Sequence, residues 1–202
     1  CKGVTGNIMI DLYAWTSANG RRPIIMLEET GTPYKIRAID PHGEAKNSAE
    51  YRKISPGGKV PCLIDPYGPD GQSIHLMESS AILLYLGEKT GQFLGSNNRA
   101  RWEVMQWLMY NATNVAISFS ALNVTREMEQ QCRNLLTVME SQLTDHDYFA
   151  SEYSIADMMS IGRFGEFRFD YIDLNEFQGV CRWRDRVLDR PAVRKAFEMA
   201  IK

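Results

Sequence analysis

The hydrophobic pattern of the chain changes its period near residue 91, and this change limits the possible folds more than any other feature. Over the first ninety residues, segments that alternate like β-strands are interleaved with segments of helical period. After residue 98 only the helical period remains. This pattern predicts an α/β domain followed by an all-α domain.

The first part is expected to follow the order β-α-β-α-β-β-α, which is a thioredoxin-like arrangement. Pro23 falls in the first turn expected for the first helix, and Gly31 is a suitable stop for it. Asp70-Gly71 suits the turn of a hairpin between the last two strands. The expected strands are 8–13, 34–39, 60–64 and 73–76, and the expected helices are 21–30, 49–54 and 78–88.

The second part is expected to contain five helices. Ser154 and Asp157 form a capping box, with Asp in place of the usual Glu or Gln, and this is interpreted as a folding signal. The helices are expected at 99–118, at 124–143, from Ser154, near Leu174 and after Pro191.

A stretch rich in Gly, Ser and Asn separates the two patterns and is interpreted as a linker. The predicted domains are therefore a thioredoxin-like domain at 7–90, a linker at 91–98 and an all-helical domain at 99–202.

Composition and charge exclude several classes of protein. Hydrophobic residues make up 44%, charged residues 24%, and the formal net charge is -2, which is typical of a globular domain. Without a basic stripe or an apolar run of about 20 residues, neither a nucleic-acid partner nor a membrane partner is expected. Four separated cysteines without metal-site spacing indicate free thiols in a reducing compartment, so we expect a cytoplasmic protein with no metal; they are Cys1, Cys62, Cys132 and Cys181.

Two segments in the first part can together hold a small zwitterionic peptide. A cis bond at Val60-Pro61 would leave the backbone of Val60 free to pair with an extended peptide, although an ordinary turn proline is the alternative. Ser79 and the helix start behind it can bind a carboxylate, and Glu78 can accept from an ammonium. Simple helix capping is the alternative for this pair.

Two lysines could neutralise a second carboxylate of such a peptide. They are Lys46 and Lys59, and the alternative is that both are solvated surface residues.

The loop before the first helix supplies a third group of candidates. A thiol placed there faces a helix N-terminus, which favours the thiolate. Ser17 can donate an O–H and Asn19 an N–H to that sulfur, or both can merely cap the helix. Thr16 offers a competing hydroxyl. Because the loop has no cysteine, the sulfur must come from the ligand.

These motifs, in this order, resemble those of the cytosolic glutathione transferases along nearly the whole chain. The front loop 17–20 is most similar to the Thr-Pro-Asn-Gly of the bacterial nu-class, which is known for glutathione-dependent disulfide reduction; Ala18 stands in place of the proline. The other matching segments are 27–34, 55–65, 78–89, 153–157 and 190–193.

The resemblance implies a homodimer that uses glutathione as co-substrate. Ser17 and Asn19 would stabilise the thiolate, with Thr16 as the competing hydroxyl, and the peptide would be bound by Lys46, Lys59, Val60, Pro61, Glu78 and Ser79. The second substrate would be a disulfide, which is favoured, or a small electrophile. The alternative of a different class is a non-catalytic module for dimerisation or protein binding.

Three further features are read as structural. Tyr13 lies within a strand pattern, and Cys62 is interpreted as a core thiol. Aromatic and Met residues at helical spacing are more typical of a core than of an electrophile pocket; these are Trp107, Met109 and Tyr110, together with Asn111.

Overall fold

In the computed structural model, residues 9–122, 128–166 and 172–201 are described. The N-terminal part is built on one four-stranded sheet in the order β2-β1-β3-β4. β1 runs parallel to β2 and antiparallel to β3, which in turn is antiparallel to β4. The strands are β1 (Ile10–Ala14), β2 (Tyr34–Ala38), β3 (Cys62–Asp65) and β4 (Ile74–Met77).

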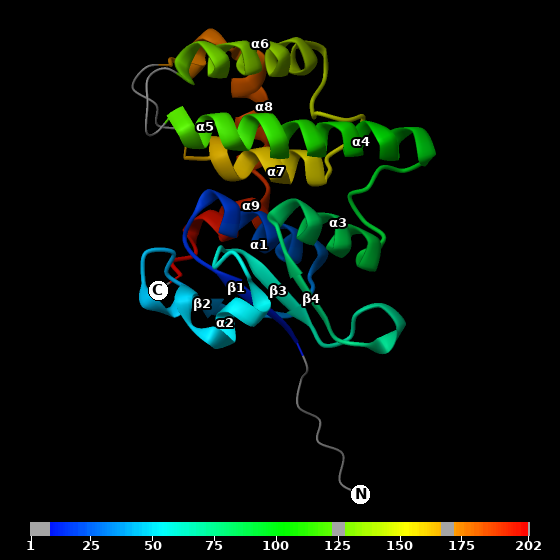
Figure 1. Cartoon of the computed structure of the whole chain (residues 1–202). Helices are drawn as coiled ribbons and strands as arrows, with labels where there is room; N and C mark the ends of the chain where they lie inside the picture. The colour runs from blue at the N-terminus through cyan, green and yellow to red at the C-terminus, as the bar shows by residue number, and fades with distance from the viewer. Residues whose placement is uncertain (1–8, 123–127, 167–171, 202) are drawn as a thin grey trace, which may run out of the picture.

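Three helices flank this sheet, and the element order agrees with the prediction. α1 (Ala18–Thr30) and α3 (Ser79–Thr90) cover the face toward the helical part, while α2 (Ala49–Ile54) lies on the opposite face (Figure 1). Because side chains alternate across a strand, Ile10, Leu12 and Ala14 are the residues of β1 buried beneath α1 and α3. The predicted thioredoxin-like arrangement is confirmed.

The start of α1 differs from the prediction by three residues. Ser17 caps the helix, so Ala18, Asn19 and Gly20 form its first turn, and Pro23 lies inside the helix beyond that turn. The predicted stop is confirmed, since Gly31 adopts a left-handed conformation with φ of 62°. The shift matters because Asn19 now stands on a helix rather than in a loop.

In the C-terminal part, all the regular elements of the described residues are helices or helical turns, and two expected elements are corrected. The expected helix 99–118 is interrupted by a π-turn, Asn111–Val115, whose buried Asn111 donates to the carbonyl of Ala156 at 3.2 Å. The helix expected near Leu174 is a short 3₁₀ turn, Leu174–Glu176, and residues 124–127 of another lie outside the described residues. The helices are α4 (Asn98–Tyr110), α5 (Ala116–Leu122), α6 (Glu129–Asp145), α7 (Ile155–Phe164), α8 (Gln178–Leu188) and α9 (Pro191–Glu198).

The predicted capping box at the start of α7 is confirmed and is part of the core. Both Ser154 and Asp157 are fully buried, and the Asp157 carboxylate accepts hydrogen bonds from Ser154 N at 3.0 Å and from Trp183 Nε1 at 2.8 Å. Burial raises the pKa of this carboxyl to about 6, although its hydrogen bonds act in the opposite direction. The box therefore fixes both the start of α7 and the position of α8.

The two parts of the chain are packed together through α1. A β-carbon at Gly162 of α7 would lie only 2.5 Å from the carbonyl oxygen of Ala18, so this position requires glycine for the close approach. Arg190, before α9, forms a bidentate pair with Glu29 of α1 at 2.6 and 2.9 Å. The boundary at 91–98 nevertheless stays a prediction. Within the described residues, every helix is too short or too polar to cross a membrane.

Candidate functional site

Ser17 carries its hydroxyl at the N-terminus of α1, where the predicted thiolate would lie. Its Oγ accepts from the amide of Gly20 at 3.2 Å, and the nearest acceptor for its own proton is the carbonyl of Trp15 at 3.4 Å. A hydrogen bond of that length is weak. The hydroxyl can therefore keep its capping contact and still turn its proton toward a ligand.

Thr16, the competing candidate, uses its hydroxyl elsewhere. Its Oγ1 accepts from the amide of Ile201 at 2.9 Å and lies 3.2 Å from the carbonyl of the same residue. Both functions of the hydroxyl are thus engaged by the C-terminal segment, and the loop is held in place by this contact. Of the two hydroxyls, the geometry favours Ser17 as the one available to a sulfur.

Arg22 joins the two helix starts that the sequence singled out. Its Nη1 donates to Asn19 Oδ1 at 2.6 Å and to Ser79 Oγ at 3.1 Å, and its Nε donates to the carbonyl of Met159 in α7 at 2.8 Å. Because Asn19 Oδ1 is occupied, the amide nitrogen of Asn19 is left as the donor for a ligand. Ser79 Oγ, in contrast, is turned inward toward the guanidinium.

The charge of Arg22 has no carboxylate partner within the described part of the chain. The side chain is 2% exposed. Burial is the larger cause that lowers the pKa of Arg22 to about 9, and the charge of Arg163 is the smaller one. The guanidinium is therefore still a cation at pH 7. A buried unpaired cation between two helix N-termini makes this region strongly attractive to an anion.

Arg22 was missed by the sequence analysis, which treated Arg21-Arg22 as ordinary helix residues. The two arginines differ sharply in the structure, because Arg21 pairs with Glu166 at 2.6 and 2.8 Å. One signal was available: Asn19 and Arg22 are three residues apart and share a face once the helix starts at Ala18.

Glu78 stands at the N-cap of α3 with an unusual backbone. Its φ of 70° and ψ of 118° are rarely adopted by residues other than glycine. The side chain is exposed, and no partner within the described residues binds the amides of Ser79 and Ser80 in the first turn of α3. The start of α3 therefore has amides that can bind a carboxylate and a carboxylate that can accept from an ammonium. Contact of Glu78 and Ser79 with a ligand stays a prediction.

The peptide bond between Val60 and Pro61 is cis, as anticipated. Val60 lies outside β3, and neither its amide nor its carbonyl has a hydrogen-bond partner among the residues described. The backbone of the preceding residue, Lys59, is held by two hydrogen bonds. Its carbonyl accepts from Tyr51 Oη at 2.7 Å and from Ser55 Oγ at 2.9 Å. Tyr51 and Ser55, which the sequence analysis did not single out, thus hold this edge rigid.

The two candidate lysines lie on adjoining segments. Lys46 is in the 3₁₀ turn Glu44–Asn47, and its Nζ donates to the carbonyl of Pro41 at 2.5 Å. Its own carbonyl would be 3.0 Å from a β-carbon at Gly58, which shows how closely this turn packs on the segment that leads to Lys59. Lys59 has an exposed side chain. Their contact with a ligand stays a prediction.

Tyr13 and Cys62, which are interpreted as structural, are both packed against other side chains of the N-terminal part. Tyr13 packs against Tyr51 with ring centroids 5.8 Å apart, and Cys62 is fully buried.

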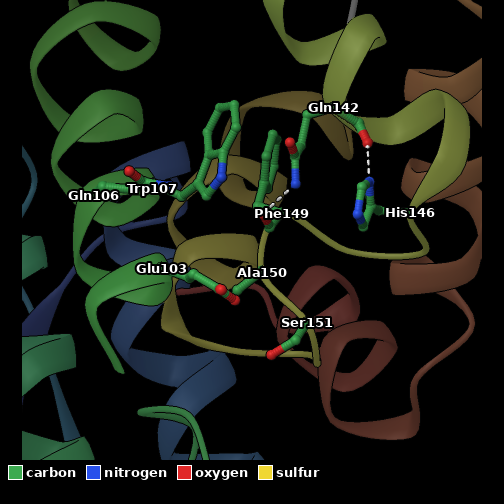
Figure 2. A pocket seen from close by; sticks show the side chains of 8 residues that line it. All are labelled: Glu103, Gln106, Trp107, Gln142, His146, Phe149, Ala150 and Ser151. Carbon is green, nitrogen blue, oxygen red and sulfur yellow. Dashed lines mark hydrogen bonds between the residues drawn. The ribbon is translucent and has the colours of Figure 1, made fainter. Parts of the chain in front are cut away.

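Of the four electrophile-pocket candidates, Trp107 and Tyr110 lie together with ring centroids 5.4 Å apart and border one shallow pocket, whereas the other two have different surroundings. Met109 is 43% exposed, whereas Asn111 is 1% exposed. Trp107 borders a cavity of about 370 Å³ between α4, the end of α6 and the loop that precedes α7 (Figure 2). Its aromatic floor is formed with Phe149, and polar side chains, including Glu103 and Gln142, surround it. None of the lining residues comes from α1 or α3.

The arrangement of potential metal ligands also bears on the chemistry of this region. Among the residues that the structure describes, no three His, Cys, Asp or Glu side chains lie close enough together to hold a metal ion.

Fold and site together define a class: a thioredoxin-like domain with an appended helical domain, in which two helix N-termini lie beside a buried cation. Residues 16–89 match the family model described as the N-terminal domain of glutathione S-transferase. The chain is 31% identical to the disulfide-bond oxidoreductase YfcG of Escherichia coli (strain K12), over 93% of this chain and 94% of that protein. It is also 31% identical to the disulfide-bond oxidoreductase YghU of the same organism, over 94% of this chain and 74% of that protein.

Solved structures give the same result. A glutathione transferase from Pseudomonas putida, with one glutathione disulfide bound per subunit, superposes with a TM-score of 0.90 at 28% identity, over 97% of this chain and 94% of that chain. A family member from Pseudomonas fluorescens, with two glutathione molecules bound, also gives a TM-score of 0.90 at 28% identity, over 96% and 95% of the two chains. The chain therefore belongs to the glutathione transferase family.

Proposed function

We propose that this protein binds glutathione, stabilises its thiolate beside Ser17 and Asn19, and uses it mainly to reduce disulfides. The observation that carries the proposal is the Arg22 guanidinium, which lies 2.6 Å from Asn19 Oδ1 and 3.1 Å from Ser79 Oγ. One buried cation thus joins the start of α1, where the sulfur would lie, to the start of α3, where a carboxylate would bind. Such placement favours a ligand with a thiolate and a carboxylate a few ångströms apart.

Glutathione fits the remaining groups of the site. Its cysteinyl backbone would pair with the free amide and carbonyl of Val60, whose orientation depends on Pro61. Its amino group would meet the exposed carboxylate of Glu78. Its glycyl carboxylate would be neutralised by Lys46 and Lys59. A peptide bound in this way would be held at both ends and along its backbone.

The chemistry proceeds by thiol–disulfide exchange. The glutathione thiolate attacks one sulfur of the substrate disulfide, a new S–S bond forms, and the other sulfur leaves as a thiolate that takes up a proton. A second glutathione thiolate then attacks the mixed disulfide and releases the second substrate thiol with glutathione disulfide. Two glutathione molecules are oxidised for each disulfide reduced. The names of the two relatives from Escherichia coli support this reaction over conjugation.

The test compares steady-state turnover of a small disulfide with that of a chlorodinitrobenzene-type electrophile, with Ser17→Ala and Asn19→Ala in parallel. Disulfide reduction with weak conjugation, and loss of activity in both variants, is the expected result. Strong conjugation alone would favour an ordinary transferase. Glutathione binding without turnover of either substrate would favour the non-catalytic dimerisation or protein-binding module instead.

A homodimer and a cytoplasmic location are part of the proposal. Large apolar side chains are exposed on both parts of the chain: Trp102 at 68% and Met109 at 43% on α4, and Met77 at 47% on β4. Trp102 and Met109 are two helical turns apart and lie on one face. An exposed apolar pair such as Trp102 and Met109 on one helix face is typical of an association surface. Light scattering should give a dimer for the wild type and a monomer for Trp102→Glu.

A further inference from the structure

Arg163, near the C-terminal end of α7, has a guanidinium that is only partly satisfied. Its Nη2 donates to Ser120 Oγ of α5 at 2.6 Å. Its Nε is buried and has no partner in the described part of the chain, and burial lowers the pKa of the group. The hydroxyl of Ser120 is the one protein acceptor of its five N–H donors among the described residues, so the planar, partly exposed guanidinium keeps donors for a ligand.

Arg163 follows the residue of α7 that packs most closely on the start of α1. The adjacent Gly162 packs so closely on α1 that a β-carbon there would be 2.5 Å from the Ala18 oxygen and 3.1 Å from Cγ of Arg22. α7 packs on α1 and lies between α1 and α5 (Figure 1). Arg163 therefore lies where the helical part meets the turn that carries Ser17 and Asn19.

Carboxylates that could neutralise this region are already in use. Glu166, one turn beyond Arg163 in sequence, is held in a bidentate pair by Arg21. Among the described residues, no acidic side chain lies within ion-pair distance of Arg163 or Arg22. The charge of Arg163 acts on Arg22, and an anion bound between the two parts would interact favourably with both guanidinium groups.

We infer that Arg163 selects second substrates that carry a carboxylate close to the reacting disulfide sulfur. Arg22 faces the glutathione side through Asn19 and Ser79, whereas Arg163 extends from the helical side toward Ser120. A carboxylate is the group that matches an under-satisfied guanidinium in both charge and geometry. The inference rests on the proposed function and adds the chemical class of the second substrate.

The experiment compares the kcat/KM of the full chain for an anionic disulfide, dithiodipropionate, with that for the neutral hydroxyethyl disulfide. In Arg163→Gln we expect kcat/KM to fall about tenfold or more for the anionic substrate and to stay within about twofold for the neutral one. Arg163→Lys should retain most of the preference, because it keeps the charge. Arg99→Gln, which removes a charge from a side chain that is 92% exposed, is the matched control and should change neither value.

A binding measurement separates this inference from the proposed reaction. S-Carboxyethylglutathione and S-hydroxyethylglutathione differ in one charge and need no turnover. Calorimetric titration should show that Arg163→Gln weakens binding of the carboxyethyl conjugate about tenfold and leaves the hydroxyethyl conjugate unchanged. If the enzyme reduces no disulfide but this difference in binding is found, the proposed reaction is refuted and the anion site at Arg163 is still supported. Equal losses for both conjugates, no loss for either, or failure of both to bind the wild type would overturn the inference.

Discussion

Replacing Ser17 should change the acidity of bound glutathione and the stability of the fold by separable amounts. Its Oγ accepts from the amide of Gly20 at 3.2 Å, while its own proton has only a weak contact with Trp15. A hydrogen bond to a charged acceptor contributes about 1.5–3 kcal/mol. Since one pKa unit corresponds to about 1.4 kcal/mol, Ser17→Ala should raise the pKa of the bound thiol by about 1 to 2 units.

The same substitution also removes a helix cap, which costs about 1 kcal/mol of unfolding free energy. Ser17→Gly is the matched variant, because glycine at an N-cap costs only a few tenths of a kcal/mol. Both variants should shift the thiol pKa equally, but only Ser17→Ala should be clearly destabilised. Ser17→Thr keeps a hydroxyl, so both the pKa of the bound thiol and the unfolding free energy should stay near the wild-type values.

The assay is the ultraviolet absorbance of the thiolate of bound glutathione as a function of pH, with urea unfolding measured alongside. Thr16→Val is the counterpart, because the Thr16 hydroxyl is engaged by Ile201. It should leave the thiol pKa unchanged. A thiol pKa in Ser17→Gly that equals the wild-type value, or a thiol pKa in Thr16→Val above the wild-type value, would refute the assignment of the hydroxyl to Ser17.

Four further predictions concern Arg22, Glu78 and Asp157. Arg22→Met should raise KM for glutathione at least about tenfold because the buried cation is lost, whereas Arg21→Met should affect stability without changing KM; steady-state kinetics distinguishes them. Glu78→Gly should stabilise the ligand-free protein by about 1 kcal/mol, since glycine tolerates the observed φ, yet weaken glutathione binding; unchanged affinity in calorimetry would contradict the role of the carboxylate. Asp157→Asn should destabilise the fold by about 3 kcal/mol because an amide NH₂ would face N–H donors. The raised pKa of Asp157, about 6, means that its contribution to stability is full below about pH 4 and is lost as pH rises through 6. The wild type should therefore gain up to about 3 kcal/mol from this group between pH 7 and pH 4, and Asp157→Asn should not; urea unfolding across this range tests it.

Much of the fold could be predicted because local patterns and tertiary packing agree. The alternation in β1 and the glycine after α1 are read directly from the chain, and α2 occurs at the predicted residues. The errors arose where two local signals compete. Pro23 is typical of a first helical turn, but the cap at Ser17 starts the helix earlier. The π-turn at Asn111 depends on a contact with Ala156, which local periodicity cannot reveal.

The candidate site divides in the same way. Ser17, Val60 and Glu78 stand out because their roles depend on backbone geometry that short motifs encode. Arg22 does not stand out, because nothing local distinguishes it from Arg21. Both arginines are buried, and only the packing of the helical part on α1 leaves Arg22 without a carboxylate partner among the described residues while Arg21 pairs with Glu166.

The hydrogen bond from Arg22 to the carbonyl of Met159 has a consequence for the order in which the protein matures during synthesis. The two residues are 137 positions apart, although the guanidinium belongs to the part made first. A nascent chain that has completed its sheet still lacks the acceptor that orients this cation. We therefore expect tight glutathione binding to appear on the ribosome only after α7 has emerged and docked, so that the peptide would recognise finished molecules and not their folded first halves.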